Sequence, residues 1–277
     1  MTWVSGHIEV RPKVFSLTGD EFAGGRVEWI SPNHVVVVVP TYNESENLPI
    51  LAAAVLAQGY RLIVVDDDSP DGTGEIADRL AEADPRMKVV HRPAKEGLGP
   101  AYGSGFLNAL AQNPEVIVQM DCDLSHDPAD IPRLVEAISS GAEVAMSSRY
   151  ILGGSTPDWP RRRRLLSKGG NLYARAMLGL PIRDATGGFR AWRPAALEKL
   201  DFQHSETSGY GFQVELAMRS VDSGLQIEEV PIIFRDRTRG TSKMNTHIVI
   251  EAMVLVTRWG LKRRLAEIWH RMAGSKS

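Results

Sequence analysis

From Val35 onward the chain alternates short apolar runs with longer amphipathic stretches. The first run, Val35–Val39, is five consecutive valines, which is typical of a strand buried on both faces. After it, Leu48, Leu51, Ala52, Val55 and Leu56 recur at helical spacing,. The predicted strands are Val35–Val39, Leu62–Val65, Lys88–His91, Val116–Met120 and Glu143–Ser147, and helices are predicted to start near Asn43 or Ser45, Gly74, Ala101 and Pro128. This alternation predicts an α/β fold with a mostly parallel central sheet and helices on both faces.

The pattern is less regular outside this region. Residues 1–33 have no sustained period and end in a Ser-Pro-Asn turn, so we expect an N-terminal arm or extension,. Beyond residue 150 we predict a loop over 151–164, a helix over 165–178, strands at Gly187–Arg193 and Ile227–Phe234, a helix over Phe212–Val221 and a long amphipathic helix from His247 to about Met272. The predicted organisation is an arm over 1–33, an α/β domain over 34–245 and an amphipathic helix with a basic tail over 246–277.

Composition narrows the function classes. The 277 residues carry a net charge of −2, so no global field favours nucleic acid as a partner,. Cys122 is the single cysteine, which excludes an intramolecular disulfide, argues against a cysteine-based metal site and suits the reducing cytoplasm,. No signal-like or membrane-spanning apolar run is evident, so we expect a soluble or peripheral protein.

Acidic residues follow three of the predicted strands. They are Glu44, the run 66–68, and the pair Asp121 and Asp123. Parallel strands end at one edge of the sheet, where ligands of such folds bind. The two carboxylates of Asp121-Cys122-Asp123 leave an extended segment on one side and suit Mg²⁺ or Mn²⁺. Three successive acids at 66–68 repel one another and need a partner such as a nucleobase, ribose hydroxyls or a metal.

Each motif also has a simpler interpretation. Either acidic segment could be a solvated turn, and the glycines at 97, 99, 103 and 105 match no phosphate-loop spacing and favour close backbone packing,. A phospho-accepting receiver domain with Asp121 as acceptor fits less well, because a complete strand–helix unit precedes the first acidic cluster. The basic run 161–164, with Arg149 and Lys168, is either a solvated face or a phosphate site. A second basic group surrounds Gly240.

In combination these motifs resemble a known family. The segments 40–44, 66–69, 121–126 and 147–150 occur in the order and spacing of inverting family-2 glycosyltransferases, whose fold is the Rossmann-like GT-A type. The segments Trp159-Pro160…Arg163…Ser167-Lys168, Asp184…Gly188-Phe189-Arg190 and 237–243 are similar to those of the polyprenol (dolichol-type) phosphate mannose synthases. The likeness covers roughly 34–262.

The resemblance implies roles for individual residues. The guanosine pocket would be lined by Pro40, Tyr42, Glu44, Val65 and Asp67. Asp121 and Asp123 would hold the metal on the donor diphosphate, with Cys122 contributing its backbone and Ser125, where some relatives carry Gln, a doubtful or water-mediated third ligand. Arg149, Arg237 and Lys243 would contact the donor phosphates. Arg163 and Ser167 would receive the lipid phosphate, and the catalytic set would be Asp123, Arg149, Arg163 and Ser167.

The resemblance also implies the reaction: transfer of mannose from GDP-mannose to a polyprenyl monophosphate, with inversion. A phosphate monoester is largely dianionic at neutral pH, so it needs cations to position it more than a base, and no general base is assigned. The alternatives are the same machinery with a UDP-sugar such as UDP-glucose, a polysaccharide acceptor, or a non-catalytic lipid- or nucleotide-binding module.

The lipid acceptor places the expected site at the cytoplasmic face of a membrane. Ile248, Ala252, Leu255, Val256 and Trp259 share one face of the C-terminal helix, with Trp269 extending it and Arg258, Lys262, Arg263, Arg264 and Arg271 beside it. Such a helix can lie in a membrane surface or pack against the sheet. Because relatives without their own membrane span often work with a membrane-embedded protein, such a partner is a further expectation.

Overall fold

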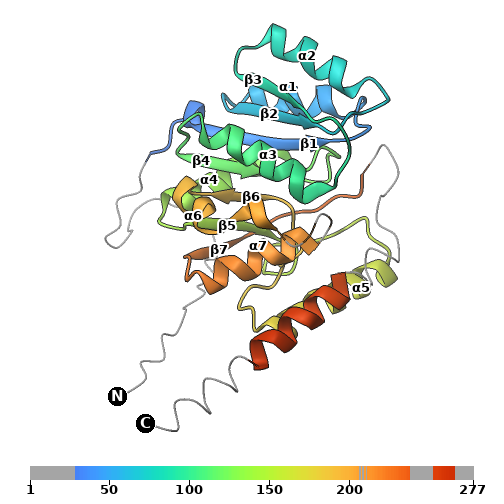
Figure 1. The fold of residues 1–277 in the computed structure, drawn as a ribbon, viewed down its shortest axis with the longest axis vertical. Coiled ribbons are helices and arrows are strands. Elements are labelled where there is room, and N and C mark those ends of the chain that lie inside the picture. The colour runs from blue at the N-terminus through green and yellow to red at the C-terminus, as the bar shows by residue number, and fades with distance from the viewer. Residues whose placement is uncertain (1–28, 206, 208, 210, 238–251, 266–277) are drawn as a thin grey trace.

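A seven-stranded sheet forms the centre of the computed structural model, which describes residues 29–205, 207, 209, 211–237 and 252–265 (Figure 1). The strands are β1 (Val35–Thr41), β2 (Arg61–Asp66), β3 (Met87–His91), β4 (Val116–Gln119), β5 (Val144–Ser148), β6 (Arg190–Trp192) and β7 (Ile227–Pro231). They lie in the order β3-β2-β1-β4-β6-β5-β7. Strand β6 pairs antiparallel with β4 and β5, and the other pairs are parallel. The predicted mostly parallel α/β sheet is therefore confirmed.

Helices cover both faces of this sheet. They are α1 (Leu48–Leu56), α2 (Thr73–Ala83), α3 (Leu98–Leu110), α4 (Ile131–Ser139), α5 (Arg161–Leu178), α6 (Pro194–Lys199) and α7 (Gly211–Asp222), with short 3-10 turns at Pro32–His34, Pro128–Asp130 and Phe202–His204. The valines of β1 alternate between two apolar cores, one beneath α1, α2 and α4 and the other beneath α3, α6 and α7. An uninterrupted valine run is what a strand buried on both faces requires.

The structure departs from the predicted elements after residue 150. Helix α5 begins at Arg161, inside the segment expected to be a loop, because Pro160 ends the extended chain and arginine is a good helix former,. Strand β6 is shorter than expected, and the short helix α6, which starts at Pro194, was not predicted. The glycines of α3 do serve close packing, since a Cβ on Gly105 would lie 2.3 Å from Cγ1 of Val38.

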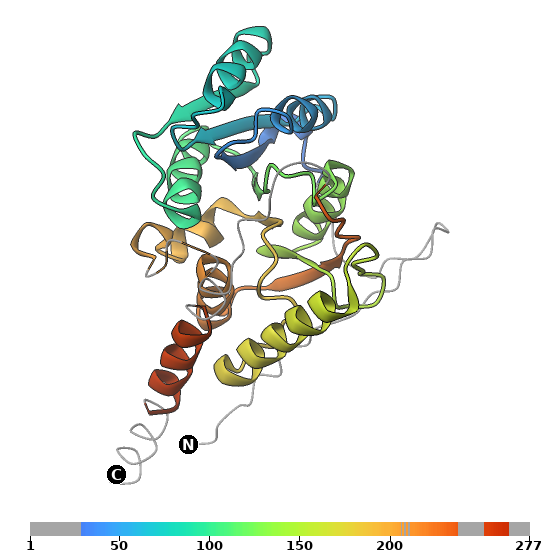
Figure 2. The same cartoon turned by 90° about the vertical axis from the view of Figure 1, so that its right-hand side faces the viewer.

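The C-terminal segment 252–265 is helical and packs beside α5 (Figure 2). The Tyr173 hydroxyl lies 2.6 Å from Oγ1 of Thr257, and the backbone at Gly260 abuts the carbonyl of Met177. Val256 and Trp259 are buried in the core shared with α5 and α7. The predicted apolar face is thus used for packing, although against helices instead of the sheet, and Ile248 and Trp269 lie outside the described residues. Among those residues, no helix is both long and apolar enough to cross a bilayer.

Candidate active site

The loops that follow β1, β2 and β4 lie at the carboxyl edge of the sheet. Each contains one non-glycine residue with positive φ, namely Asn43 (58°), Asp68 (56°) and Leu124 (59°). Such conformations persist where the surrounding structure enforces them, and they concentrate at functional sites. This edge is therefore the first place to look for chemistry.

Hydrogen bonds tie the first two of these loops together. The Asn43 amide donates to Oγ of Ser69 at 3.1 Å, and the Glu44 amide donates to Oγ1 of Thr73 at 2.9 Å. The Ser45 amide donates to Oδ2 of Asp71 at 3.1 Å. Backbone donors that would otherwise face solvent are satisfied within the protein. The loop carrying Tyr42 and Glu44 is consequently fixed before any ligand arrives.

The chain supplies its own partners to two of the three carboxylates at 66–68. Asp66 is buried and accepts from the Thr41 hydroxyl at 2.9 Å and from the Ser69 hydroxyl at 2.6 Å. Asp67 is buried against Arg92, whose Nη1 donates to its Oδ1 at 2.6 Å. Burial raises the pKa of Asp67 against the opposing effect of this arginine. The expectation that all three acids need an external partner is thus wrong for Asp66 and Asp67, which have partners within the protein.

The other residues expected around a nucleoside lie along the same edge. Pro40, Tyr42 and Glu44 are partly exposed, and Nζ of Lys95 lies 3.9 Å from the centre of the Tyr42 ring. Val65 is fully buried, with its side chain packed toward α3 near Gly105. Arg92 directly follows β3 and was missed. The rule that selects residues after parallel strands, applied to β3 as well, would have found it.

Asp121 is held from two sides immediately beyond β4. The Tyr102 hydroxyl donates to its Oδ1 at 2.9 Å, and the backbone of Gly188 lies against its Oδ2. Burial, with the nearby charge of Asp123 adding to it, raises the pKa of Asp121 to about 6. This carboxylate is therefore poised for an external positive charge.

Asp123 already has a positively charged partner within the protein. Nη2 of Arg237 lies 2.9 Å from its Oδ2, while its Oδ1 accepts from the Ser125 amide at 3.0 Å. Cys122 and Ser125 are buried on either side. Within the described residues, no group of three or more histidine, cysteine or acidic side chains is arranged to hold a metal. Two carboxylates are what this part of the chain offers.

Arg149 and Asp184 form a buried ion pair behind this edge. Nε and Nη2 of Arg149 bond both carboxylate oxygens of Asp184 at 2.7 Å, and its backbone amide donates to Oδ2 at 3.0 Å. The Asp184 charge and these bonds raise the pKa of Arg149 despite burial, and the same contacts hold the pKa of Asp184 low. The Nε–Nη2 edge of this guanidinium is therefore committed to the protein.

The residues expected to receive a phosphate lie at the start of α5. Nη1 of Arg163 donates to Oδ2 of Asp236 at 2.8 Å, and its guanidinium stacks 4.2 Å from the centre of the Trp159 ring. Ser167, one turn further along α5, accepts a hydrogen bond from the Tyr150 hydroxyl at 2.6 Å. Both side chains of the Arg163–Asp236 pair are 39% exposed, so an incoming anion can compete for the arginine,.

Residues 235–237 connect the two groups. Arg237 pairs with Asp123, Asp236 pairs with Arg163, and the Arg235 amide donates to the carbonyl of Ser125 at 3.2 Å. The structure thus brings Asp123, Arg237 and Arg163 into one chain of contacts. Lys243, the remaining predicted phosphate contact, lies outside the described residues.

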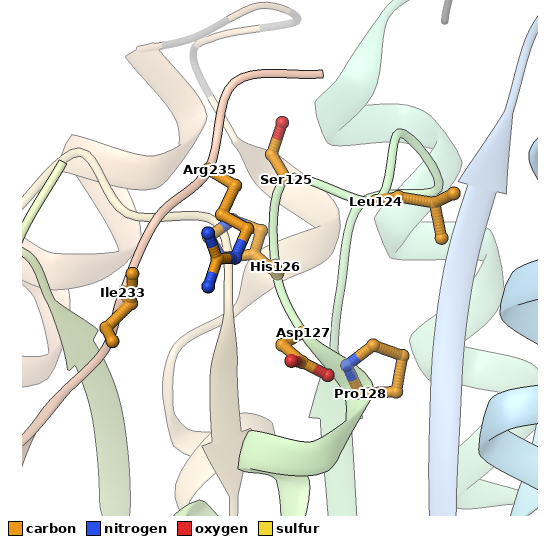
Figure 3. A pocket seen from close by; sticks show the side chains of 7 residues that line it. All are labelled: Leu124, Ser125, His126, Asp127, Pro128, Ile233 and Arg235. Atoms are coloured by element: carbon orange, nitrogen blue, oxygen red, sulfur yellow. The ribbon is translucent and has the colours of Figure 1, made fainter. Parts of the chain in front are cut away.

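An aromatic cluster and a small cavity support this connection. The His126 ring packs 5.2 Å from Phe189 and 5.0 Å from Phe234, and Phe234 lies 5.3 Å from Trp159. Burial lowers the pKa of His126 to about 4, so its ring is neutral at pH 7. A cavity of about 200 Å³ opens between the 124–128 segment and Ile233 and Arg235 (Figure 3).

Comparison with known proteins places this arrangement among sugar transferases. Residues 36–201 match the model for glycosyl transferase family 2. The chain is 46% identical over 233 residues to polyprenol monophosphomannose synthase of Mycolicibacterium smegmatis, covering 83% of this chain and 88% of that protein. It is 46% identical over 232 residues to undecaprenyl-phosphate mannosyltransferase of Micrococcus luteus, covering 83% and 95%. It is 38% identical over 225 residues to dolichol-phosphate mannosyltransferase of Pyrococcus furiosus, covering 78% and 61%.

Solved structures support the fold. Glucosyl-3-phosphoglycerate synthase of Mycobacterium tuberculosis, in complex with Mn²⁺, UDP-glucose and phosphoglyceric acid, superimposes with a TM-score of 0.60. The match covers 83% of this chain and 79% of that chain at 21% sequence identity. At this identity the likeness concerns the fold alone.

Proposed function

Because this chain belongs to glycosyl transferase family 2, we propose that it transfers mannose from GDP-mannose to a polyprenyl monophosphate, with inversion, giving polyprenyl phosphomannose and GDP. The sugar and the class of acceptor rest on two relatives that are 46% identical to this chain over the aligned 233 and 232 residues. The observation that carries the proposal is the contact chain from Asp123 through Arg237 and Asp236 to Arg163. It joins an acidic edge suited to a nucleoside diphosphate to a basic helix start suited to a phosphate.

On the donor side, we assign the nucleoside to the edge formed by Pro40, Tyr42, Glu44 and Asp67. Asp67 presents a buried carboxylate fixed by Arg92, which suits the donor groups of a guanine edge. Val65 would contribute through packing beneath the base. Arg237, now on Asp123, would turn to the diphosphate, together with Lys243.

The donor set at Asp121 and Asp123 fits a divalent cation. Both residues provide hard oxygen ligands, and Oδ2 of Asp123 already accepts a cationic group,. With two protein carboxylates, the donor diphosphate and water would complete the shell, with Ser125 at most a water-mediated contact. A bound Mg²⁺ or Mn²⁺ would supply charge to the leaving diphosphate.

On the acceptor side, Arg163 and Ser167 would position the lipid phosphate. A phosphate monoester is largely dianionic at neutral pH and can attack without a base, so cations that align it are sufficient. Arg149, expected to contact the donor phosphates, is bound through Nε and Nη2 to Asp184, so we assign it a supporting role as half of a buried ion pair. The buried, neutral His126 is a packing residue in this scheme.

We place the working enzyme at a membrane surface, on its cytoplasmic face. On α5 the side chains of Leu165, Leu166 and Leu172 are 70%, 65% and 63% exposed, beside the cations of the arginine run. On the adjacent 252–265 helix, Val254, Leu261 and Leu265 are also exposed, with Arg258, Lys262 and Arg264 between them. Exposed leucines beside basic residues suit the interface of an anionic bilayer. A membrane-embedded protein partner is the alternative occupant.

The test is a transfer assay with radiolabelled donors. Purified protein with Mg²⁺ or Mn²⁺ should transfer mannose from GDP-mannose to polyprenyl phosphate in detergent or vesicles, and chelation should stop it. UDP-glucose in place of GDP-mannose should give little product. Efficient transfer from UDP-glucose, or to a neutral polysaccharide, would overturn the assignment of donor or acceptor.

A further inference from the structure

Tyr102 is a fully buried tyrosine whose hydroxyl reaches the acidic edge. It lies in α3, one turn after the helix start, and its ring stacks on Phe106 (5.6 Å between centres) and Phe212 (6.1 Å). Its hydroxyl donates a hydrogen bond to Oδ1 of Asp121 at 2.9 Å. A ring immobilised on two aromatic neighbours therefore delivers one donor to one carboxylate oxygen.

Gly188 confines the same carboxylate from the opposite side. A Cβ at this position would lie 2.9 Å from Oδ2 of Asp121, closer than such contacts occur. The segment around Gly188 is itself anchored by the buried Arg190, which donates to the carbonyls of Gly187, Ala185 and Gln213 at 2.9–3.0 Å. Asp121 is consequently fixed between a tyrosine hydroxyl and a bare stretch of backbone.

Asp123 is held quite differently. Its partner Arg237 is a long, flexible side chain that remains 17% exposed. The two carboxylates thus differ in kind: one is locked by the core, and the other is paired with a group that a stronger cation can displace. For a cation that binds at this edge, the Asp121 carboxylate is therefore already oriented as a ligand.

We propose that Tyr102 is a positioning residue that orients Asp121 for a divalent cation bound together with a nucleoside diphosphate. The inference rests on the proposed function, because that function requires the cation. Hydrogen bonds to metal-binding carboxylates fix their orientation, and losing one typically weakens metal binding or activity by about 10- to 100-fold. Tyr102 acts through Asp121 and touches neither donor nor acceptor.

The test measures Mn²⁺ binding to the full chain in the presence of GDP, from the electron paramagnetic resonance signal of free Mn²⁺. Tyr102→Phe removes one hydroxyl and keeps the stacked ring. Its Mn²⁺ affinity should fall about 10- to 100-fold, while metal-free GDP affinity by calorimetry and the unfolding temperature stay close to wild type. Tyr173→Phe is the matched control, since it removes a tyrosine hydroxyl that bonds Thr257 instead, and it should leave Mn²⁺ affinity unchanged.

A second variant approaches Asp121 from the other side. Gly188→Ala keeps Tyr102 but pushes on Oδ2, so it should also weaken Mn²⁺ binding without changing metal-free GDP affinity. Wild-type Mn²⁺ affinity in Tyr102→Phe, or equal losses of Mn²⁺ and metal-free GDP affinity, would overturn the role of Tyr102. Should Tyr102→Phe fail to fold, wild-type Mn²⁺ affinity in Gly188→Ala would overturn the role by showing that the orientation of Asp121 does not govern Mn²⁺ binding. Failure of wild type itself to bind Mn²⁺ with GDP would instead refute the metal site of the proposed function.

Discussion

The acidic edge and the α5 face differ in how their functional side chains are supported. At the acidic edge, Asp66 and Asp67 are buried and Asp121 is partly buried, and each accepts a hydrogen bond from a side chain of the protein. On the α5 face, Arg163 is held by a half-exposed partner, and three leucines of the helix face solvent. The contrast suggests a prebuilt site for a small, soluble donor and an open face that is completed by a lipid surface.

The largest expected effect lies at the acidic edge. Asp121→Ala and Asp123→Ala should each reduce mannosyl transfer by at least about 100-fold, since a metal contact contributes several kcal/mol to stabilising the leaving diphosphate. Radiolabel transfer measures this, and Glu136→Ala, an exposed acid on α4, is the control. Near-normal activity of either aspartate variant would remove the donor side of the comparison.

The next prediction compares how much the free energy of unfolding falls when each of two ion pairs is broken. Asp184→Asn leaves Arg149 buried without its counter-charge, so the free energy of unfolding should fall by about 3–5 kcal/mol. Asp236→Asn breaks the exposed pair with Arg163 and should cost at most about 1 kcal/mol. Chemical denaturation measures both. Equal losses would mean that the two regions are supported in the same way.

Acid should reveal the buried, neutral state of His126. Its pKa of about 4 in the folded protein lies below the value of about 6.5 in the unfolded chain,. The unfolded state therefore takes up the proton first, and the stability contributed by neutral His126 is present above pH 6.5 and lost as pH falls toward 4. The pKa of Asp121 is raised in the folded protein, so its contribution to stability increases as the pH falls from 6 to 4, opposite to that of His126,.

His126→Phe separates these two contributions. The variant should gain stability relative to wild type as pH falls from 6.5 to 4, by up to about 3 kcal/mol. Denaturation curves across pH 4–8 measure the difference, which should be flat above pH 7. A difference that does not change with pH would show that His126 has the same pKa in the folded and unfolded states.

The smallest expected effect of a single side chain is the loss of vesicle binding when one exposed leucine of α5 is replaced. Replacing Leu165, Leu166 and Leu172 with serine should weaken pelleting with anionic vesicles by tenfold or more, because each exposed leucine contributes about 1 kcal/mol when it enters an apolar phase. Leu107→Ser on α3, another exposed leucine, is the control. GDP binding should be unaffected. Vesicle binding that is insensitive to all three changes would show that these leucines do not contact the bilayer.

Sequence reasoning was more successful for the acidic edge than for the α5 face. Strands β1 to β5 could be predicted within about two residues because valine runs and helical periodicity repeat there,. A strand was predicted around β6, but its exact length and antiparallel pairing could not be, since three residues carry no period. The start of α5 could not be predicted either, because Pro160 alone does not show where the helix begins. Tyr102 was missed for another reason. Its role depends on a tertiary contact with Asp121, which no local pattern encodes.

One measurement tests the division between the two regions most directly: transfer by Arg163→Ala at varied polyprenyl phosphate, paired with calorimetry of GDP binding in the presence of Mn²⁺. Because a charged hydrogen bond to phosphate contributes about 1.5–3 kcal/mol, the KM for the lipid should rise about tenfold or more while GDP affinity stays within twofold of wild type. Loss of GDP affinity with an unchanged KM for the lipid would contradict the account.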